Sequence, residues 1–440
     1  MADRATVRQI VNLGMEVTSG TTVAATKRMQ GLQLDSTIKT TASPFRAMGQ
    51  KYNSVVEINQ EWVEAKVSGD ALYGEIIYLL SSLFGKPSPA QNGSASNLGY
   101  SWTFDPSTSS EDVPQTFTIE QGDAVRAHKF GYGLCTDLTL AWDRTKAVTQ
   151  SGTIIGQRLT DAITLTPVVD NVWSLSITGT PTGGTFTITA VVNGSTQTTA
   201  AIAYNATSAA VQSALAALTN IGSSNVAVTG TTLPSGTQTI TFQGQLAGQT
   251  VTLTKTDSLT GGTSPASAVT QTTAGSGPAT IPVAPVLPTQ IDVYIDSSAA
   301  GLGSTQMTRV FSSELAIGTK FAPIWTLDSS NNSFAAHIEK APKATAKILM
   351  EADAQGMGLL TTMRPNSTQF MRFLATGTQI DSSPAFDYKM QVDMAVQVSA
   401  PEQFKDQDGV YAIGWGFELV NDDPWGKAME IIVNCERSAL

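Results

Sequence analysis

Charged side chains are nearly absent from one long stretch of this sequence. Between residues 171 and 276 the only charged residues are Lys255 and Asp257, although Asp, Glu, Lys and Arg make up 14% of the 440-residue chain. Thr, Ser, Gly, Ala and Val fill most of the stretch, and a proline-rich run follows it (Pro278, Pro282, Pro285 and Pro288). A change of composition bounded by stiff connectors is typical of an inserted domain. We therefore expect an inserted domain at 171–276 and a Pro-rich linker at 277–290.

Cysteine and histidine are also scarce. Cys135 and Cys435 are the only cysteines, and His128 and His337 are the only histidines. Two thiols so far apart form neither a disulfide framework nor a metal site. No GxSxG, HExxH, P-loop or CxxC pattern occurs, and acidic runs such as 421–423 are typical of solvated turns. The sequence therefore predicts no catalytic, cofactor or metal site.

Long apolar runs are missing as well. Runs such as 76–80 fall far short of the roughly 20 apolar residues that a membrane-spanning helix needs. We expect a soluble protein, made in the cytosol and without membrane insertion.

The net charge of −10 disfavours direct binding to nucleic acid, because such binding requires Lys and Arg to neutralise phosphates. Since Lys255 and Asp257 cancel, the excess of acid lies in the two segments that flank the insert.

The flanks alternate apolar and polar residues with the period of two that marks half-buried antiparallel strands. Strands are predicted at 55–67, 134–142 and 152–157 before the insert, and at 344–353, 390–398 and 410–419 after it. The spacing of apolar residues predicts one helix from Asp70 to Gly85 and a shorter one from Asn366 or Ser367 to Gly377. Within the insert we expect a hairpin at 173–192 and a helix capped by Asn205 or Thr207.

Both flanks show the same order: a long strand, a helix that ends at glycine, and long alternating strands. This order predicts a mainly β protein with two modules, at 51–170 and 291–440, each a β-sandwich or barrel with one α-helix. Residues 1–50 are expected to form an N-terminal arm. The insert is expected to be a small β-rich domain with one helix. Residue identity between the flanks is weak, so the duplication rests on the order of elements.

Several stretches of the flanks carry a resemblance to a known family. They are Leu13-Gly14-Met15-Glu16, Gly20-Thr21-Thr22-Val23-Ala24-Ala25, Phe45-Arg46 with Gly49, the helix at 70–85, the strands at 135–142 and 154–156, Gly409-Val410-Tyr411, Asp423 with Gly426-Lys427-Ala428, and Ile431-Ile432-Val433-Asn434. These diffuse patterns resemble the tail tube (major tail) proteins of long-tailed, siphovirus-type bacteriophages.

The resemblance implies a structural virion protein rather than an enzyme. Its subunits would form homo-oligomeric rings whose sheets join into a β-barrel, and stacked rings would form the tail tube through which DNA is ejected into the host. The family's rings usually hold six tube modules, so two modules per chain imply a trimeric ring with pseudo-sixfold symmetry, whereas one module would require a hexameric ring. The N-terminal arm and long loops would join successive rings.

The same resemblance implies further partners and a location. A tape-measure protein and tail-tip or terminator proteins would contact the tube, which would be assembled in the host cytoplasm and reside in the viral tail. DNA must slide through without sticking, and an acidic or neutral polar lumen repels phosphate. The polar sides of the alternating strands supply the lumen-facing candidates Asp137, Thr139, Gln391, Asp393 and Gln397. Alternatively, these faces meet a neighbouring subunit or the outer solvent.

Stretches 177–186, 202–207 and 259–263 of the insert resemble an Ig-like decoration module that is repeated in phage and bacterial surface proteins. The resemblance implies a domain on the outside of the tube, with low charge suited to weak contact with a host surface.

Two alternatives to the tail tube function remain open. The Thr/Ser/Gly-rich insert is compatible with a bacterial surface or adhesin-type β-domain protein, and a carbohydrate-active enzyme would need a carboxylate pair that the sequence does not offer.

Overall fold

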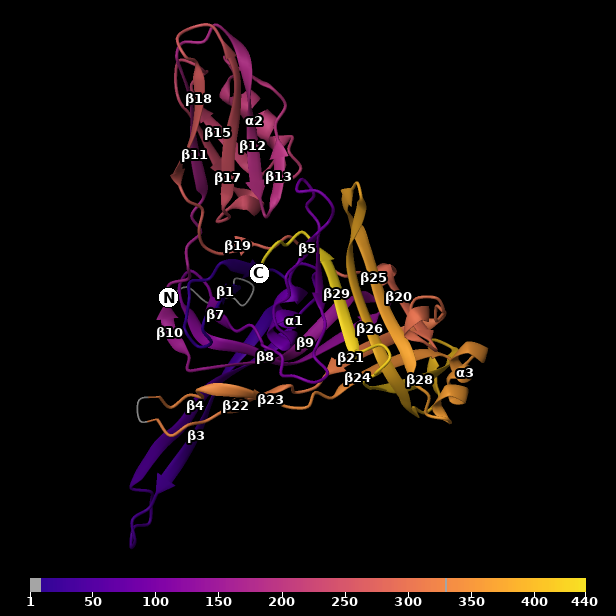
Figure 1. Cartoon of the computed structure of the whole chain (residues 1–440). Helices are drawn as coiled ribbons and strands as arrows, with labels where there is room; N and C mark the ends of the chain where they lie inside the picture. The colour runs from indigo at the N-terminus through magenta and orange to yellow at the C-terminus, as the bar shows by residue number, and fades with distance from the viewer. Residues whose placement is uncertain (1–8, 329–330) are drawn as a thin grey trace.

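The computed structural model describes residues 9–328 and 331–440 and confirms a mainly β chain. Figure 1 shows a large body built from both flanks, the insert above it and a hairpin that projects below. The described part of the body contains the helices α1 (Ile76–Phe84) and α3 (Ala354–Met363). Its strands are β1 (Ile10–Met15), β2 (Lys27–Met29), β3 (Gln33–Phe45), β4 (Val55–Ser68), β5 (Ala90–Gln91), β6 (Tyr100–Phe104), β7 (Phe117–Gly122), β8 (Ala127–Asp143), β9 (Lys146–Gly156), β10 (Thr160–Ile163), β19 (Ala279–Thr280), β20 (Ile291–Asp296), β21 (Val310–Ile317), β22 (Phe321–Ile324), β23 (Ala336–Glu339), β24 (Ala344–Glu351), β25 (Gln369–Ser382), β26 (Ala385–Pro401), β27 (Lys405–Gln407), β28 (Val410–Leu419) and β29 (Met429–Cys435).

A long antiparallel sheet, here called the central sheet, runs through the body. Its strands pair in the order β3, β4, β9, β8, β21, β24, β28 and β26. The strands from β3 to β8 precede the insert in sequence, and those from β21 to β26 follow it. Each half consists of a hairpin, a helix and a second hairpin: β3–β4, α1 and β8–β9, then β21–β24, α3 and β26–β28. The two halves meet where β8 pairs with β21.

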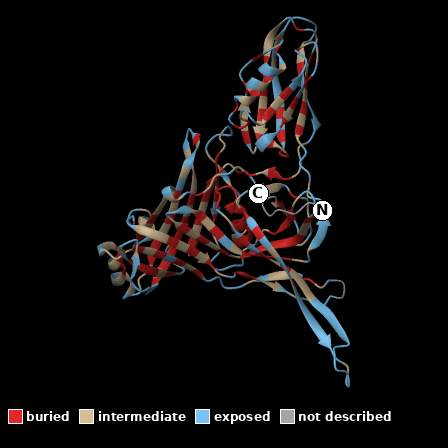
Figure 2. Cartoon of the chain, turned by 180° about the vertical axis from the view of Figure 1, so that it is seen from behind, coloured by how far each residue is buried: buried red, intermediate tan, exposed pale blue. Residues whose placement is uncertain are grey.

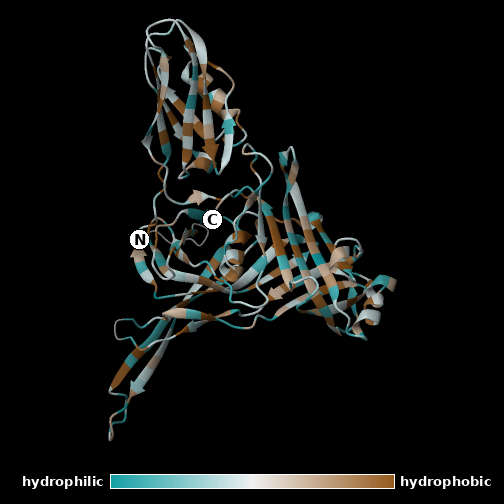
Figure 3. Cartoon of the chain, viewed as in Figure 1, coloured by the Kyte–Doolittle hydropathy of each residue, from teal (hydrophilic) through white to brown (hydrophobic). Residues whose placement is uncertain are grey.

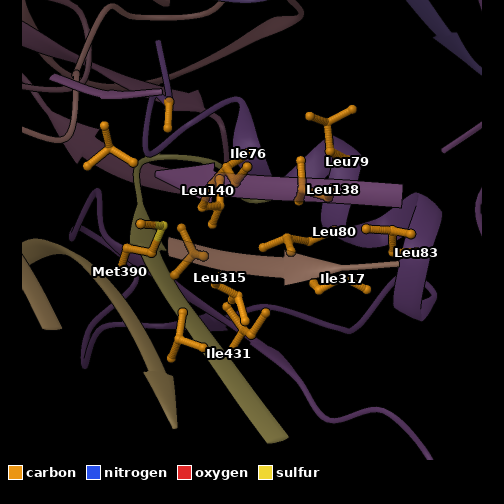
Figure 4. Packing of buried hydrophobic residues seen from close by; sticks show 14 of the residues in the cluster. Ile76, Leu79, Leu80, Leu83, Leu138, Leu140, Leu315, Ile317, Met390 and Ile431 are labelled. Atoms are coloured by element: carbon orange, nitrogen blue, oxygen red, sulfur yellow. The ribbon is translucent and has the colours of Figure 1, made fainter. Parts of the chain in front are cut away.

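One hydrophobic core lies against the central sheet and spans both halves. Figure 4 shows Leu138 and Leu140 of β8 beside Leu315 and Ile317 of β21, with side chains of α1 on one side and Met390 and Ile431 on the other. Each of the four residues at the β8–β21 seam is at most 2% exposed. Because full burial of such a side chain is worth about 1.5–3 kcal/mol, the seam is held by packing as well as by backbone hydrogen bonds.

Helix α1 is shorter than predicted and is buried on all sides. It begins at Ile76 rather than near Asp70, because Asp70 and Leu72 form isolated bridges with Thr149 and Pro285. It ends at Gly85, whose φ of 85° is a left-handed conformation that glycine adopts readily. All residues from Ile76 to Leu83 are buried, so the helix lies inside the body rather than on its surface.

The helix predicted at 367–377 is wrong. This segment lies in β25, which pairs with β26 from Gln369 onward. Phe370, Phe373 and Leu374 fit helical spacing, yet Met371, Phe373 and Ala375 alternate into the core as a strand. The helix of the second half is α3, and the Asp353 carboxylate caps it by accepting from the Gln355 and Gly356 N–H groups at 3.0 and 2.9 Å.

Residues 10–29 belong to the body and not to the expected N-terminal arm. Strand β1 pairs with β7 and β2, and it places Val11 and Leu13 in the core. The next residues are fixed by Glu16, which is 3% exposed. Its carboxylate accepts hydrogen bonds from the Thr116 and Thr118 hydroxyls, both at 2.9 Å, and from the N–H groups of Gly20 and Tyr132 at 2.8 and 3.0 Å.

The segment that does project is the β3–β4 hairpin, whose outer half is exposed on both strands (Figure 2). Apolar side chains are exposed along it (Figure 3), among them Phe45 at 63%, Tyr52 at 75% and Val56 at 63%. The hairpin β22–β23 braces its base. There the N–H of Glu61 donates to the Asn332 carbonyl at 2.9 Å, and the rings of Trp62 and Trp325 meet edge to face at 5.5 Å.

The insert has two sheets and a hydrophobic cluster of its own. It comprises helix α2 (Ser208–Ala216) and the strands β11 (Asn171–Thr178), β12 (Gly183–Val192), β13 (Ser195–Thr198), β14 (Ile202–Ala203), β15 (Val226–Gly230), β16 (Gln238–Phe242), β17 (Val251–Thr260) and β18 (Ala266–Thr273). The hairpin predicted at 173–192 is wrong, since β11 pairs with β16 and β18 whereas β12 pairs with β13, β14 and β17. The Thr207 cap is confirmed, because its hydroxyl accepts from the Ala210 N–H at 3.2 Å.

The two ends of the insert lie side by side. Val169 and Ser276 exchange two backbone hydrogen bonds, at 2.8 and 3.0 Å. A second attachment joins β13 to the loop before β6. In it, the Ser195 hydroxyl donates to the Ser96 carbonyl at 2.8 Å, and the Thr196 N–H donates to the Ala95 carbonyl at 2.7 Å.

We expect Glu16→Ala to lower the free energy of unfolding by about 3 kcal/mol, because it leaves several buried donors without an acceptor. Urea unfolding followed by circular dichroism measures the change. Glu57→Ala, on the exposed hairpin, is the matched control and should change stability by less than about 0.5 kcal/mol. Equal stability of the two variants would contradict the structural role of Glu16.

Candidate functional site

The side of the central sheet that faces away from the core forms a continuous surface, here called the polar face. From β4 to β26 most of its residues are half-buried or exposed and polar or charged. On β9 the face also includes the buried Thr153 and Ile155, and Ile155 packs in an apolar cluster with Phe321 and Phe334. The half-buried and exposed residues include Glu64, Lys66, Thr149, Ser151, Asp137, Thr139, Ala141, Asp143, Glu314, Ala316, Thr345, Lys347, Gly416, Glu418 and Gln397. The polar face therefore crosses from one half of the body to the other without interruption.

Strand register brings three of the predicted lumen residues onto this face. From Thr139 one row of directly paired residues runs through Ala316, Thr345 and Glu418 to Gln397. Directly opposed residues of antiparallel strands point to the same side, so Thr139 and Gln397 share one surface. Asp137 lies two positions before Thr139 on β8. Its carboxylate accepts from the Thr136 hydroxyl at 2.9 Å and the Thr153 hydroxyl at 3.4 Å.

The other two candidates, Gln391 and Asp393, lie before Gln397 on β26 and in a different environment. Asp393 is 3% exposed, and both of its oxygens accept from the Arg372 guanidinium, at 2.6 and 2.8 Å. The Gln391 amide donates to the same carboxylate at 2.7 Å. The hydrogen bonds that Arg372 donates to Asp393 raise the pKa of Arg372. Asp393 is thus half of a buried ion pair, and its charge is neutralised within the chain.

Acidic side chains outnumber basic ones on the polar face between β4 and β28. Glu64, Asp137, Asp143, Glu314 and Glu418 stand against Lys66, Lys146 and Lys347. The Lys343 ammonium lies 3.4 Å from Glu418 and pairs with part of the negative charge. Hydrogen bonds from the hydroxyl and N–H of Thr145 lower the pKa of Asp143, which keeps it ionised at neutral pH. Lys66 lies 3.1 Å from Glu64, so part of the positive charge is already paired. A surface with this balance repels phosphate.

A buried lysine lies near the β8–β21 seam, and the sequence alone does not predict its burial. The side chain of Lys320 is 1% exposed, and its ammonium contacts the carboxylates of Asp112 and, at 3.4 Å, Glu339. It also lies 4.6 Å from the ring centroid of Phe84, at the end of α1. These partners are distant in sequence, so no local pattern indicates the cluster. It ties both halves of the body together beside the seam.

The reactive side chains are dispersed over the part of the chain that the structure describes. Within residues 9–328 and 331–440, no three His, Cys, Asp or Glu side chains gather in a way that could hold a metal ion. Burial raises the pKa of Cys135 and raises that of Cys435 to about 12, so both remain thiols at neutral pH. The His337 Nδ1 lies 2.9 Å from the Tyr132 hydroxyl, and burial lowers the pKa of this histidine.

Comparison with models of known protein families and with curated proteins finds no match for this chain. Among the described residues, no helix combines the length and apolar character needed to cross a membrane. Any function must therefore be argued from the geometry of the polar face, the seam and the projecting hairpin.

We expect Asp393→Asn to lower the free energy of unfolding by about 2 kcal/mol, because it leaves the half-buried Arg372 charge without its carboxylate partner. The double variant Arg372→Met, Asp393→Leu removes both charges and should recover most of that loss. Urea unfolding of the two variants beside the wild type measures the difference. A double variant less stable than Asp393→Asn would show that the pair has a role beyond mutual neutralisation.

Proposed function

We propose that this chain is a tail tube subunit of a long-tailed bacteriophage, which assembles into stacked rings that conduct DNA. The observation that carries the proposal is the central sheet. Two halves with the same order of elements share one core and present one uninterrupted polar face. A sheet with one polar face is suited to line a bore when copies are arranged around an axis.

Closure into a ring also meets a need of the sheet itself. At the two ends of the central sheet, β3 and residues 397–401 of β26 each have one edge without a strand partner within the described chain. Long unpaired edges promote uncontrolled association, and pairing with neighbouring copies removes them. We favour a trimeric ring with pseudo-sixfold symmetry, since each chain supplies two similar halves; a hexameric ring is the alternative.

The charge of the polar face fits passage of DNA without specific binding. An excess of carboxylates keeps phosphate at a distance, and neutral residues such as Thr139 and Gln397 offer no positive charge to hold it. We propose that Asp137, Thr139 and Gln397 face the lumen. Asp393 and Gln391 would contribute a neutral ion-pair cluster rather than free negative charge.

The remaining parts of the chain take supporting roles in this proposal. The exposed apolar side chains of the β3–β4 hairpin suit contacts between successive rings, in place of the N-terminal arm expected from the sequence. Tape-measure, tail-tip and terminator proteins are the further partners, and the viral tail is the location. The insert projects outward, where it contacts a host surface, because an inward domain would block the bore.

Electron microscopy of the purified protein tests the proposal. We expect rings or tubes of uniform diameter with an open centre, because ring closure removes the free edges of the sheet. Mass measurement of single rings should give three chains rather than six. A protein that stays monomeric across a range of salt and protein concentrations would refute the proposal.

Deletion of the insert should leave assembly intact. Because Val169 and Ser276 are hydrogen-bonded to each other, a short Gly-Ser linker can join them without moving the body. Tube diameter and yield by microscopy are compared with those of the full chain. Circular dichroism confirms that the truncated chain is folded. A folded truncated chain that forms no tubes would assign the insert a role in assembly.

A further inference from the structure

The two ends of the central sheet have free edges of different kinds. Among the described strands, β3 pairs only with β4, although the side chain of Gln121 donates to the Leu34 carbonyl near the start of β3. Strand β26 pairs with β25 only as far as Val396, and residues 397–401 pair only with β28. The outer backbone edge of β3 can therefore pair with another strand from Thr37 towards the tip of the hairpin. The corresponding edge of β26 can pair from Gln397 to Ala400. It ends at Pro401, which has no N–H to donate.

The β8–β21 seam shows what such edges bind. The first part of β8 pairs with β7, and its last part, from Leu138 to Asp143, pairs with β21. Strand β26 repeats this arrangement: its first part pairs with β25, and its last part is open. Since β21 opens the first hairpin of the second half, its counterpart in the first half is β3, which opens the β3–β4 hairpin. The open edge of β26 therefore matches the open edge of β3.

Side chains on β3 support this match. On the core side of β3, Leu34 is 9% exposed, but Ile38 is 52% exposed although it pairs with the fully buried Val63. At the seam, the corresponding positions Leu315 and Ile317 are completely covered by β8 and the core behind it. Ile38 is thus a core-facing residue that no strand of the described chain covers.

We propose that β3 of one copy pairs antiparallel with the 397–400 edge of β26 in a second copy, repeating between chains the β8–β21 seam within the chain. The contact is head to tail, so every copy uses both edges, and it closes into a ring or continues as a filament. This inference deepens the proposed function and rests on it only for closure of the ring. The polar faces of successive copies then join into one surface.

Thiol cross-linking between two variants, each with one added surface cysteine, tests the pairing. Asp35→Cys, Thr37→Cys or Lys39→Cys on β3 is mixed with Gln397→Cys or Ala400→Cys on β26, and the mixture is treated with a short bis-maleimide. All five positions lie on the polar side of their strands. A covalent dimer should form in at least one mixture and in none of the variants alone, since each edge needs the other.

Three controls make the result interpretable. The wild type should not react, because Cys135 and Cys435 are buried. Thr345→Cys, in the middle of the polar face, should give no dimer with Thr37→Cys. Ala141→Cys with Glu314→Cys in one chain, directly opposed across the seam, should cross-link internally and shows that the reagent spans a strand pair.

Either of two results would overturn the inference: no dimer in any mixture while the seam control reacts, or a dimer from a β3 variant alone, which indicates β3–β3 pairing. Microscopy of the unmodified protein separates this from the proposed function. Open rings without edge cross-links would leave the tube proposal standing and refute the strand pairing. Cross-linked chains that never form hollow rings would support the strand pairing and refute the tube proposal.

Discussion

The antiparallel pairing of β8 with β21 is the interaction on which the rest of the body depends. It joins segments that lie on either side of the insert and makes two hairpin pairs into one sheet. Because side chains alternate along a strand, this single register sets both surfaces at once: it aligns Leu138 with Ile317 in the core and Thr139 with Ala316 on the polar face. A shift by one residue would exchange core and solvent sides across the seam. The ion cluster of Lys320 beside the seam adds a fixed point outside the sheet.

The sequence alone predicts those strands and helices whose local pattern of apolar residues agrees with their packing in the folded chain. Strands β4, β8, β26 and β28 were found because one side of each meets the core and the other does not, which produces alternation with period two. The segment at 367–377 was misjudged because its apolar residues fit two periods and only pairing with β26 decides between them. The expected arm failed for a similar reason, since β7, which pairs with β1, and the Thr116, Thr118 and Tyr132 partners of Glu16 lie 100 residues or more away.

The site shows the same division. Alternation sufficed to predict that Asp137, Thr139, Gln391, Asp393 and Gln397 face away from the core, because that follows from strand geometry alone. It could not show that Asp393 is neutralised, since Arg372 comes from a neighbouring strand that the sequence did not predict. Nor could it show that Thr139 and Gln397 share one row, which depends on the registers of all the strands between them. Charge on a strand is thus visible in sequence, whereas its partner is a property of the sheet.

The hydrogen-bonded junction at Val169 and Ser276, where the insert joins the body, affects which inserted domains such a protein can carry. The insert is attached to the body by two adjacent chain ends and by a short contact with the loop before β6, and Gly194 also lies beside Tyr100 and Ser438. The entropic cost of closing a loop grows slowly with the length of the enclosed segment. Here the hydrogen bonds between Val169 and Ser276 already hold the two ends of the inserted segment together. Domains of other sizes or folds, or none, could occupy this position with little change in the stability of the body. The junction is therefore a place where recombination could exchange the outer surface of the protein while its assembly machinery stays constant.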